Sequence, residues 1–229
     1  MKKLTLTFLF ICSMLAAFSQ CNDYYVLQDG TSWTYENYNG KGKPTGKNIQ
    51  KVKSFEKTTS GFVATINSTV LDDKGKTLTE GDLEMTCENG TITMDMRKFI
   101  PQEQLKALSS YEMKIESENL ELPSKLTVGQ SLKDGSVSLT TEGSPIPISM
   151  AVTISNRKVV GKETITTPAG TFDCYKITNT SHMKSKIGIN FSADFSGTEW
   201  IAEKVGFVKS ESFDKKGKLN GSMLLIARQ

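Results

Sequence analysis

The chain of 229 residues has few of the residues from which catalytic and metal sites are built. Its one histidine, His182, has polar neighbours and no adjacent cysteine. A transition-metal site usually needs several His or Cys ligands, and a Ser–His–acid triad needs a histidine at its centre. No G-x-S-x-G turn and no phosphate-binding glycine loop accompanies it. We therefore expect a protein that is not an enzyme and has no metal site and no cofactor.

Aromatic platforms and marked carboxylate pairs are also scarce. Trp33 and Trp200 are the two tryptophans. A glycosidase needs two facing carboxylates, yet nothing in the sequence marks any two as partners. The acidic residues on or beside expected strands are Glu84, Glu88, Asp95, Asp173, Asp194 and Glu199. The acidic residues Asp72, Asp73 and Asp82 do not have the spacing of a calcium loop.

Arginine is rare as well, with three residues that form no cluster: Arg97, Arg157 and Arg228. Without Lys2 and Lys3, 26 basic residues face 25 acidic ones. Nucleic-acid binding usually requires a basic stripe with arginine forks. The charge pattern therefore argues against a nucleic-acid partner.

The first 19 residues have the pattern of a secretory signal peptide. Lys2 and Lys3 precede an uncharged apolar run at 4–16, and Ala17 and Ser19 offer small residues at positions −3 and −1 of a cleavage site. We expect residues 1–19 to be removed and residues 20–229 to form a single exported domain in the periplasm or cell envelope. No other apolar run approaches the length of a membrane span, so we expect no transmembrane segment in the mature chain.

Three cysteines remain after the predicted cleavage, namely Cys21, Cys87 and Cys174. An odd number allows at most one internal disulfide. The favoured pair is Cys87 with Cys174, because both lie inside strand patterns that could be paired. The pairs Cys21–Cys174 and Cys21–Cys87, and no disulfide, remain open. Cys21 could alternatively be a lipid anchor, although the residues before it fit a lipoprotein signal poorly.

Alternation of apolar and polar residues with a period of two dominates the rest of the chain. It is clearest at 146–154 and 187–195, and residues 219–228 indicate a C-terminal strand. Turn signals separate these runs, and the strongest is Asn89-Gly90, which suits a type I′ hairpin. The pattern predicts a mainly β protein.

Three loops share a glycine flanked by lysines, at 39–43, 72–76 and 214–218. We interpret them as hairpin tips in which glycine supplies the left-handed residue and lysine keeps the end of a sheet soluble. The alternative interpretation is a repeated basic loop that contacts an anionic partner.

One short helix is predicted from Pro101 to Ser110. Proline suits the first helical position, Glu103 lies in the favourable first turn, and Leu105 and Leu108 form an apolar stripe. So short a helix must pack on the sheet to be stable. We expect it on the concave side of a strongly curved antiparallel sheet or open half-barrel.

Methionine is unusually frequent near this helix. Met85, Met94, Met96 and Met113 surround it in sequence, and Met150, Met183 and Met223 follow. Methionine can line adaptable apolar pockets, but it also fills ordinary cores. The sequence does not decide between a ligand cavity and a packed interior.

Three segments together resemble the TapB-like exported proteins of Gram-negative bacteria, whose domain is largely of unknown function. They are the Asp-Gly-Thr-Ser-Trp-Thr-Tyr stretch at 29–35, residues 166–177, and Glu199-Trp200 followed by residues 206–211. The resemblance covers essentially the whole mature chain. It implies a curved sheet like that of periplasmic lipoprotein carriers, which can enclose an apolar groove, and it implies no catalytic residue.

Two functions are consistent with these observations. The first is an exported protein that binds an apolar or lipid-like ligand inside a curved sheet. The second is an interaction or structural module of the envelope, which binds another protein or a surface polymer. The residues that would contact a ligand are unknown from the sequence.

Overall fold

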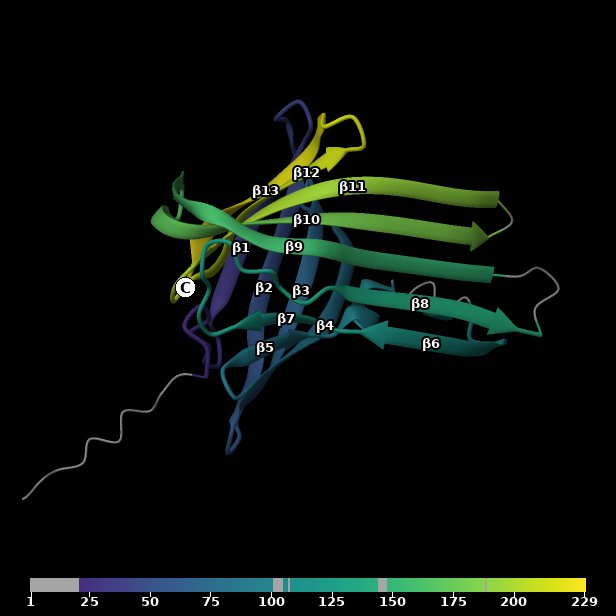
Figure 1. Ribbon diagram of the computed structural model, residues 1–229, viewed down its shortest axis with the longest axis horizontal. Helices are drawn as coiled ribbons and strands as arrows, with labels where there is room; N and C mark the ends of the chain where they lie inside the picture. Colours follow the sequence, from purple (N-terminus) through teal and green to yellow (C-terminus); the bar gives the residue numbers. More distant parts are fainter. Residues whose placement is uncertain (1–20, 101–104, 107, 144–147, 188) are drawn as a thin grey trace, which may run out of the picture.

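The chain folds into one antiparallel sheet of 13 strands, as seen in a computed structural model that describes residues 21–229 except 101–104, 107, 144–147 and 188 (Figure 1). The strand order is β6-β8-β9-β10-β11-β12-β13-β1-β2-β3-β4-β5-β7. The strands are β1 (Ser32–Asn39), β2 (Pro44–Lys57), β3 (Gly61–Asp72), β4 (Thr77–Glu88), β5 (Thr91–Met94), β6 (Glu112–Glu118), β7 (Leu120–Pro123), β8 (Gly135–Glu142), β9 (Ile148–Thr167), β10 (Gly170–Ile187), β11 (Ile189–Ala202), β12 (Gly206–Asp214) and β13 (Leu219–Arg228). The mainly β prediction is confirmed.

The sheet is nearly closed into a barrel, which goes beyond the predicted open half-barrel. Strands β6 and β7 stand at opposite ends of the strand order, yet only Asn119 separates them in the chain. β6 pairs with β8, whereas β7 pairs with β5. One stretch of chain therefore joins both edges of the sheet, although β6 and β7 are not paired with each other among the described residues.

The seam beside β7 is held by the side chain of a buried arginine. Arg157, which is 2% exposed, donates from Nη1 to the carbonyl oxygens of Glu121 in β7, at 2.9 Å, and of Lys133, at 2.8 Å. A bulge in β9 directs the Arg157 side chain toward these two carbonyls. In the bulge, Asn156 and Arg157 together lie opposite the single residue Asn179 of β10. Asn156 has a positive φ of 55°. The guanidinium thus takes the place of a missing strand partner.

The predicted helix from Pro101 to Ser110 falls largely on residues 101–104 and 107, which lie outside the described residues. Within the described part of the chain, Leu105 and Lys106 of this segment are helical, and a 3-10 turn, η1 (Met96–Phe99), precedes them. Asp95 caps η1 by accepting a hydrogen bond from the backbone N–H of Arg97. Leu105 and Leu108 do pack against the sheet, as their apolar stripe predicts.

Two hydrophobic cores fill the barrel. The larger core contains Trp33, Tyr35, Phe62, Ile177 and Leu225 among its buried side chains. The smaller core contains six buried side chains from η1, the segment after it and strands β7, β8 and β9: Met96, Ile100, Leu120, Val137, Leu139 and Val152. The polar residues between these positions point to the other face, because side chains alternate along a strand.

The segment before β1 crosses one end of the barrel and is fixed there by a disulfide. Cys21 is bonded to Cys87 of β4, and Cys174 is a buried free thiol. The favoured Cys87–Cys174 pairing is therefore wrong, and one of the open alternatives holds. Period-two patterning places Cys87 and Cys174 on strands, but it could not reveal that the N-terminal segment folds back across β4.

Buried polar contacts hold the same segment. The side-chain amide of Asn22 donates to the carbonyls of Gly90 and Leu122, and the Tyr24 hydroxyl accepts from the backbone N–H of Leu126. Since both side chains are almost fully buried, these hydrogen bonds satisfy groups that water cannot reach. The segment thereby ties together the strand ends at this side of the barrel.

The three glycine–lysine loops are hairpin tips, as predicted, and all are built in the same way. Asn39, Asp72 and Asp214 each accept two backbone hydrogen bonds, from the residues two and four positions later. The glycine of each loop has a φ between 75° and 81°. The Asn89-Gly90 hairpin is confirmed as well, since both residues have positive φ.

The seam predicts a large cost for removing Arg157. We expect Arg157→Leu to lower the free energy of unfolding by about 3 kcal/mol, because two partly buried carbonyls lose a donor that is itself buried. Urea denaturation followed by circular dichroism would measure this. Arg97→Leu is the matched control, because Arg97 forms an exposed ion pair with Asp95 and should cost less than about 1 kcal/mol. Equal losses in the two variants would contradict the role of the seam.

The disulfide predicts a second stability effect. It closes a loop with a sequence separation of 66, and we expect the Cys21→Ser, Cys87→Ser double variant to lose about 3 kcal/mol of unfolding free energy. Cys174→Ala is the control, with an expected loss of about 1 kcal/mol from a small cavity. Peptide mapping without reduction should recover Cys21 joined to Cys87. Recovery of a Cys87–Cys174 peptide would refute the pairing.

Candidate functional site

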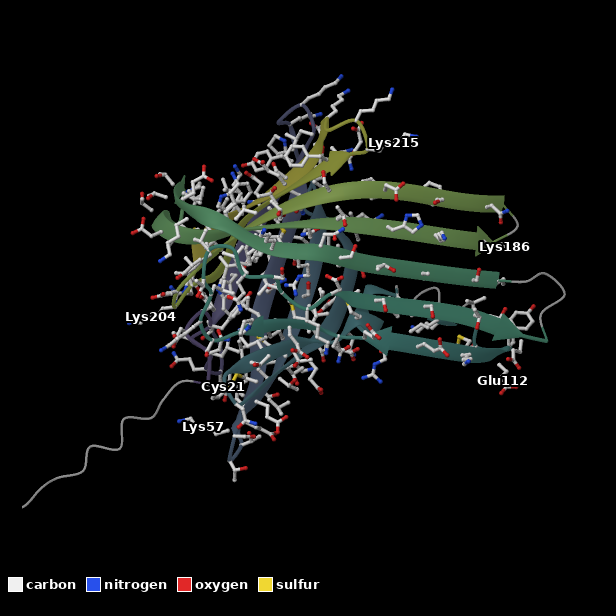
Figure 2. All side chains as sticks on the ribbon, in the orientation of Figure 1. Cys21, Lys57, Glu112, Lys186, Lys204 and Lys215 are labelled. Atoms are coloured by element: carbon white, nitrogen blue, oxygen red, sulfur yellow. A yellow bond between two sulfur atoms is a disulfide. The ribbon has the colours of Figure 1, made fainter. Side chains whose placement is uncertain are left out.

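Strand β6 and parts of strands β8–β11 extend beyond the rest of the sheet and form a structure that we call the wing. It comprises β6 and β8 with residues 148–154 of β9, 181–187 of β10 and 189–195 of β11. The neighbouring strand β12 pairs with β11 only from Phe195 onward, so the outer part of β11 has no partner on that side. Figure 1 shows these strands projecting to the right of the barrel, and Glu112 and Lys186 mark the far end in Figure 2.

One face of the wing is apolar. Residues directly opposite one another on antiparallel strands share a face, so the pairing register defines its rungs. One rung consists of Val137, Val152, Met183 and Ala193, and the next of Leu139, Met150, Ser185 and Phe191. Ser185 is the one polar residue of these two rungs. We call it the apolar face.

Burial changes steeply across the apolar face. On β8 and β9, Val137, Leu139 and Val152 are at most 8% exposed, because the second core covers them. On β10 and β11, Met183 is 38% exposed and Phe191 is 54% exposed. The same surface is therefore partly core and partly open to solvent.

Methionine and leucine side chains cover the buried part. Met94, Met113 and Met150 pack around Met96, together with Leu105 and Leu108. The methionines singled out in the sequence thus gather beside the apolar face, except Met85 and Met223, which pack against the larger core. Unbranched thioether side chains can change their packing at little cost, which suits a surface that accepts variable apolar groups.

A polar layer limits the apolar face on its inner side. Further along β11 on the same face lies Glu199, whose Oε1 accepts a hydrogen bond of 3.4 Å from Asn179. Burial raises the pKa of Glu199, and the nearby positive charge of Arg157 opposes that rise. Burial likewise lowers the pKa of Arg157. These charged groups favour polar contacts, so an apolar ligand would lie outward from them.

The opposite face of the wing is polar. His182 lies there beside Asp194, with its Nδ1 at hydrogen-bond distance from a carboxylate oxygen. The rung around them contains Ser136 and Thr153, and the next contains Lys184 and Ser192. The histidine is thus part of a cross-strand pair on a solvated surface, and no serine hydroxyl is bonded to it among the described contacts.

The other candidate residues occupy separate places. The ring of Trp200 is 3% exposed and covered by Lys176 and Lys209, with its Nε1 donating to Glu163 at 2.9 Å. Trp33 is buried and donates to the carbonyl of Val205. Neither tryptophan offers an exposed platform for a sugar ring.

The acidic candidates do not converge either. Asp95 caps η1, Asp173 accepts a hydrogen bond from Thr164, and Asp194 pairs with His182. Glu84 and Glu88 are exposed residues of β4, and Glu199 lies in the polar layer. Within the described part of the chain, no group of three or more His, Cys, Asp and Glu side chains could hold a metal ion.

The free cysteine does not provide a reactive nucleophile. Cys174 is 1% exposed, and burial raises the pKa of its thiol to about 11. Reactive cysteines have a lowered pKa and some access to solvent. Cys21, the candidate lipid-anchor residue, has its sulfur in the disulfide, and one sulfur cannot hold both a disulfide and a lipid thioether.

A surface cavity of about 860 Å³ lies at the other end of the barrel, beside the N-terminal segment. Its apolar lining includes Phe55 and Phe62, but turn residues such as Thr58, Ser60 and Asn89 make up much of the wall. We place the candidate site on the wing instead, because the apolar face is continuous there and contains the most exposed aromatic side chain among the described residues.

The sequence predicted the apolar–polar alternation that produces the apolar face. It could not show which half of the apolar face is exposed to solvent. Met183 and Phe191 belong to strand patterns like those of buried residues, but the side chains that cover β8 and β9 do not bury them. Arg157 was also missed as a structural residue. Its one local signal is the preceding asparagine, a residue that tolerates positive φ.

Two solved structures share this fold. A "putative exported protein with YmcC-like fold" from Bacteroides fragilis is 25% identical and has a TM-score of 0.70, with 91% of this chain and 100% of that chain covered. A "putative lipoprotein" from Parabacteroides distasonis is 22% identical and has a TM-score of 0.74, with 92% of this chain and 100% of that chain covered. No curated protein matches the sequence.

In the part of the chain that the structure describes, no helix has the length and apolar character needed to cross a bilayer.

Residues 28–225 match the family described as DUF3108-like, and this match includes every strand of the sheet except the last residues of β13. It thus spans well over half of the sequence. The chain belongs to the DUF3108-like family.

Proposed function

We propose that this protein is an exported, non-catalytic binding protein that holds an apolar or lipid-like ligand against the apolar face of the wing. The observation that carries the proposal is the change in burial along one surface, from Leu139 at 1% to Phe191 at 54% exposed. A fully packed sheet would bury both. Leaving a phenylalanine and a methionine in water costs hydrophobic free energy that a ligand could recover.

The composition around the site supports an apolar ligand rather than a polar one. Methionines line the buried half, and ligand sites are mostly apolar with a few polar groups that orient the ligand. Glu199 and Asn179 in the polar layer would provide such groups at the inner end. The proposal includes no reacting residue, in keeping with the buried thiol of Cys174 and the surface pairing of His182.

The similarity to other proteins supports the location. One relative is named an exported protein and another a lipoprotein, and we propose an exported location for this chain also, with residues 1–19 as its signal peptide. The resemblance to TapB-like proteins and to periplasmic lipoprotein carriers remains a prediction and favours an envelope role. The alternative is that the apolar face docks on another envelope protein, because exposed apolar patches also mark such interfaces.

A dye-binding experiment tests the apolar face directly. Nile red should bind the purified protein, and the Met183→Ser, Phe191→Ser double variant should bind it about ten-fold more weakly, which corresponds to a loss of about 1.4 kcal/mol of apolar contact. The matched control is Leu78→Ser with Val160→Ser, which removes two apolar side chains of similar exposure elsewhere. Absence of dye binding, or an equal loss in both doubles, would count against the proposal.

Native mass spectrometry of protein purified from the periplasm addresses the natural ligand. We expect a discrete added mass that is released as a lipid on denaturation. The Met183→Ser, Phe191→Ser variant should carry less of it than the Leu78→Ser, Val160→Ser control. A mass equal to that of the unmodified chain, together with a second protein bound through the apolar face, would support the interaction module instead.

A further inference from the structure

Three lysine-rich hairpin tips lie side by side at one end of the sheet. The hairpins β12–β13, β1–β2 and β3–β4 are consecutive in the strand order, and their tips are residues 214–218, 39–43 and 72–76. Because neighbouring strands alternate in direction, all three tips point to the same end. Figure 1 shows the first two together at the top of the molecule.

The pairing register brings the tips into direct proximity. Asn39 of the β1–β2 tip is paired with Gly221, three residues after the end of the β12–β13 tip. Gly46, three residues after the β1–β2 tip, is paired with Asp72 of the β3–β4 tip. At Gly40 an added Cβ would lie 2.2 Å from the carbonyl oxygen of Leu219, so the first two tips pack closely. The three tips form a row that we call the lysine rim.

The lysine rim concentrates the positive charge of the molecule. It holds three aspartates, and its seven lysines are Lys41, Lys43, Lys74, Lys76, Lys215, Lys216 and Lys218. The whole chain has a net charge of only +3, so the rest of the molecule is close to neutral. All seven lysines are exposed, and no ion pair to any of them occurs among the described residues.

The loop geometry turns the lysines outward. The side chains of Asp72 and Asp214 are engaged by backbone N–H groups of their own loops, at 2.8 to 3.0 Å, instead of reaching the lysine ammonium groups. These hydrogen bonds also hold the pKa of Asp214 below its usual range. Figure 2 shows Lys215 extending from the edge of the molecule into solvent.

An apolar side chain lies next to these cations. Leu78 follows Lys76 by two residues at the start of β4 and is 59% exposed, the highest value among the large hydrophobic residues of the described part of the chain. Lysines beside an exposed leucine are a combination that suits the boundary between lipid head groups and acyl chains.

We propose that the lysine rim binds a membrane surface that contains anionic lipids. Lysine acts as a point charge without the planar fork of arginine, which suits a diffuse layer of head-group phosphates more than one discrete phosphate. A basic residue near an anionic bilayer contributes about 1 kcal/mol, and the contribution falls off within a Debye length. The rim would therefore hold the protein reversibly, with Leu78 inserted between head groups. This inference does not depend on a ligand at the wing.

Vesicle sedimentation tests the rim with the full mature protein. We expect binding to vesicles of phosphatidylcholine and phosphatidylglycerol in equal amounts, weak binding to phosphatidylcholine alone, and release by high salt. One substitution in each tip gives the variant Lys43→Gln, Lys74→Gln, Lys216→Gln. Its partition onto the anionic vesicles should fall about 100-fold if each lysine contributes as stated.

The matched control removes the same number of charges from other exposed lysines, in the variant Lys158→Gln, Lys184→Gln, Lys186→Gln. It should retain partition within about two-fold of the original protein, since these lysines lie away from the rim. Leu78→Ser should weaken binding to the anionic vesicles at low salt, because it removes the apolar contribution and leaves the lysines unchanged. Thermal unfolding by circular dichroism verifies that all variants are folded.

Three results would overturn the proposal. They are absence of binding to the anionic vesicles, equal losses in the two lysine triples, and retention of the protein by dextran sulfate through the rim without vesicle binding. The last result would assign the rim to a polyanionic polymer. Each result is independent of dye binding at the wing, so the two proposals can fail separately.

Discussion

The shape of this protein depends on two hydrogen bonds from a single buried guanidinium. The Arg157 side chain binds the carbonyls of Glu121 and Lys133, at the seam where β7 has no strand on its outer side. An unpaired buried carbonyl is costly, so a barrel interrupted at this point needs a donor from elsewhere. In the β9 bulge, Asn156 and Arg157 lie opposite the single residue Asn179 of β10. This geometry places the Arg157 guanidinium beside the two carbonyls. The donor thereby holds β7 and the segment at Lys133 beside β9, next to the single stretch of chain that makes both β6 and β7.

Closure at the seam makes the two ends of the molecule different. At one end, the N-terminal segment crosses the strand ends and is fixed by the Cys21–Cys87 disulfide and by the buried side chains of Asn22 and Tyr24. At the other end, β8–β11 continue past β12 and are covered on one side only by η1 and the residues that follow it. The protein thus has an end closed by a disulfide and buried hydrogen bonds, and a wing with an apolar surface, on which the proposed ligand binding rests.

The apolar face and the lysine rim belong to different strands and meet different physical requirements. The apolar face lies on β8–β11 and gains free energy when Met183 and Phe191 leave water. The rim belongs to the hairpins β12–β13, β1–β2 and β3–β4. Their exposed lysine ammonium groups attract negative charge over a Debye length. A binding protein that acts at an envelope membrane would use both, the rim to stay near the bilayer and the face to hold an apolar group.

The sequence by itself determined the strands, the turns and the scarcity of catalytic groups. Alternation predicted β9 and β11, the Asn89-Gly90 pair predicted its hairpin, and the glycine–lysine loops predicted three tips, because each of these depends on neighbouring residues alone. The tertiary structure decided what depends on residues far apart in the chain. It paired Cys87 with Cys21 instead of Cys174, closed the predicted half-barrel through Arg157, and left Phe191 exposed on a face whose other half is core. It also placed the three tips in one row. Local propensity cannot specify such contacts, because they follow from strand order and register across the whole sheet.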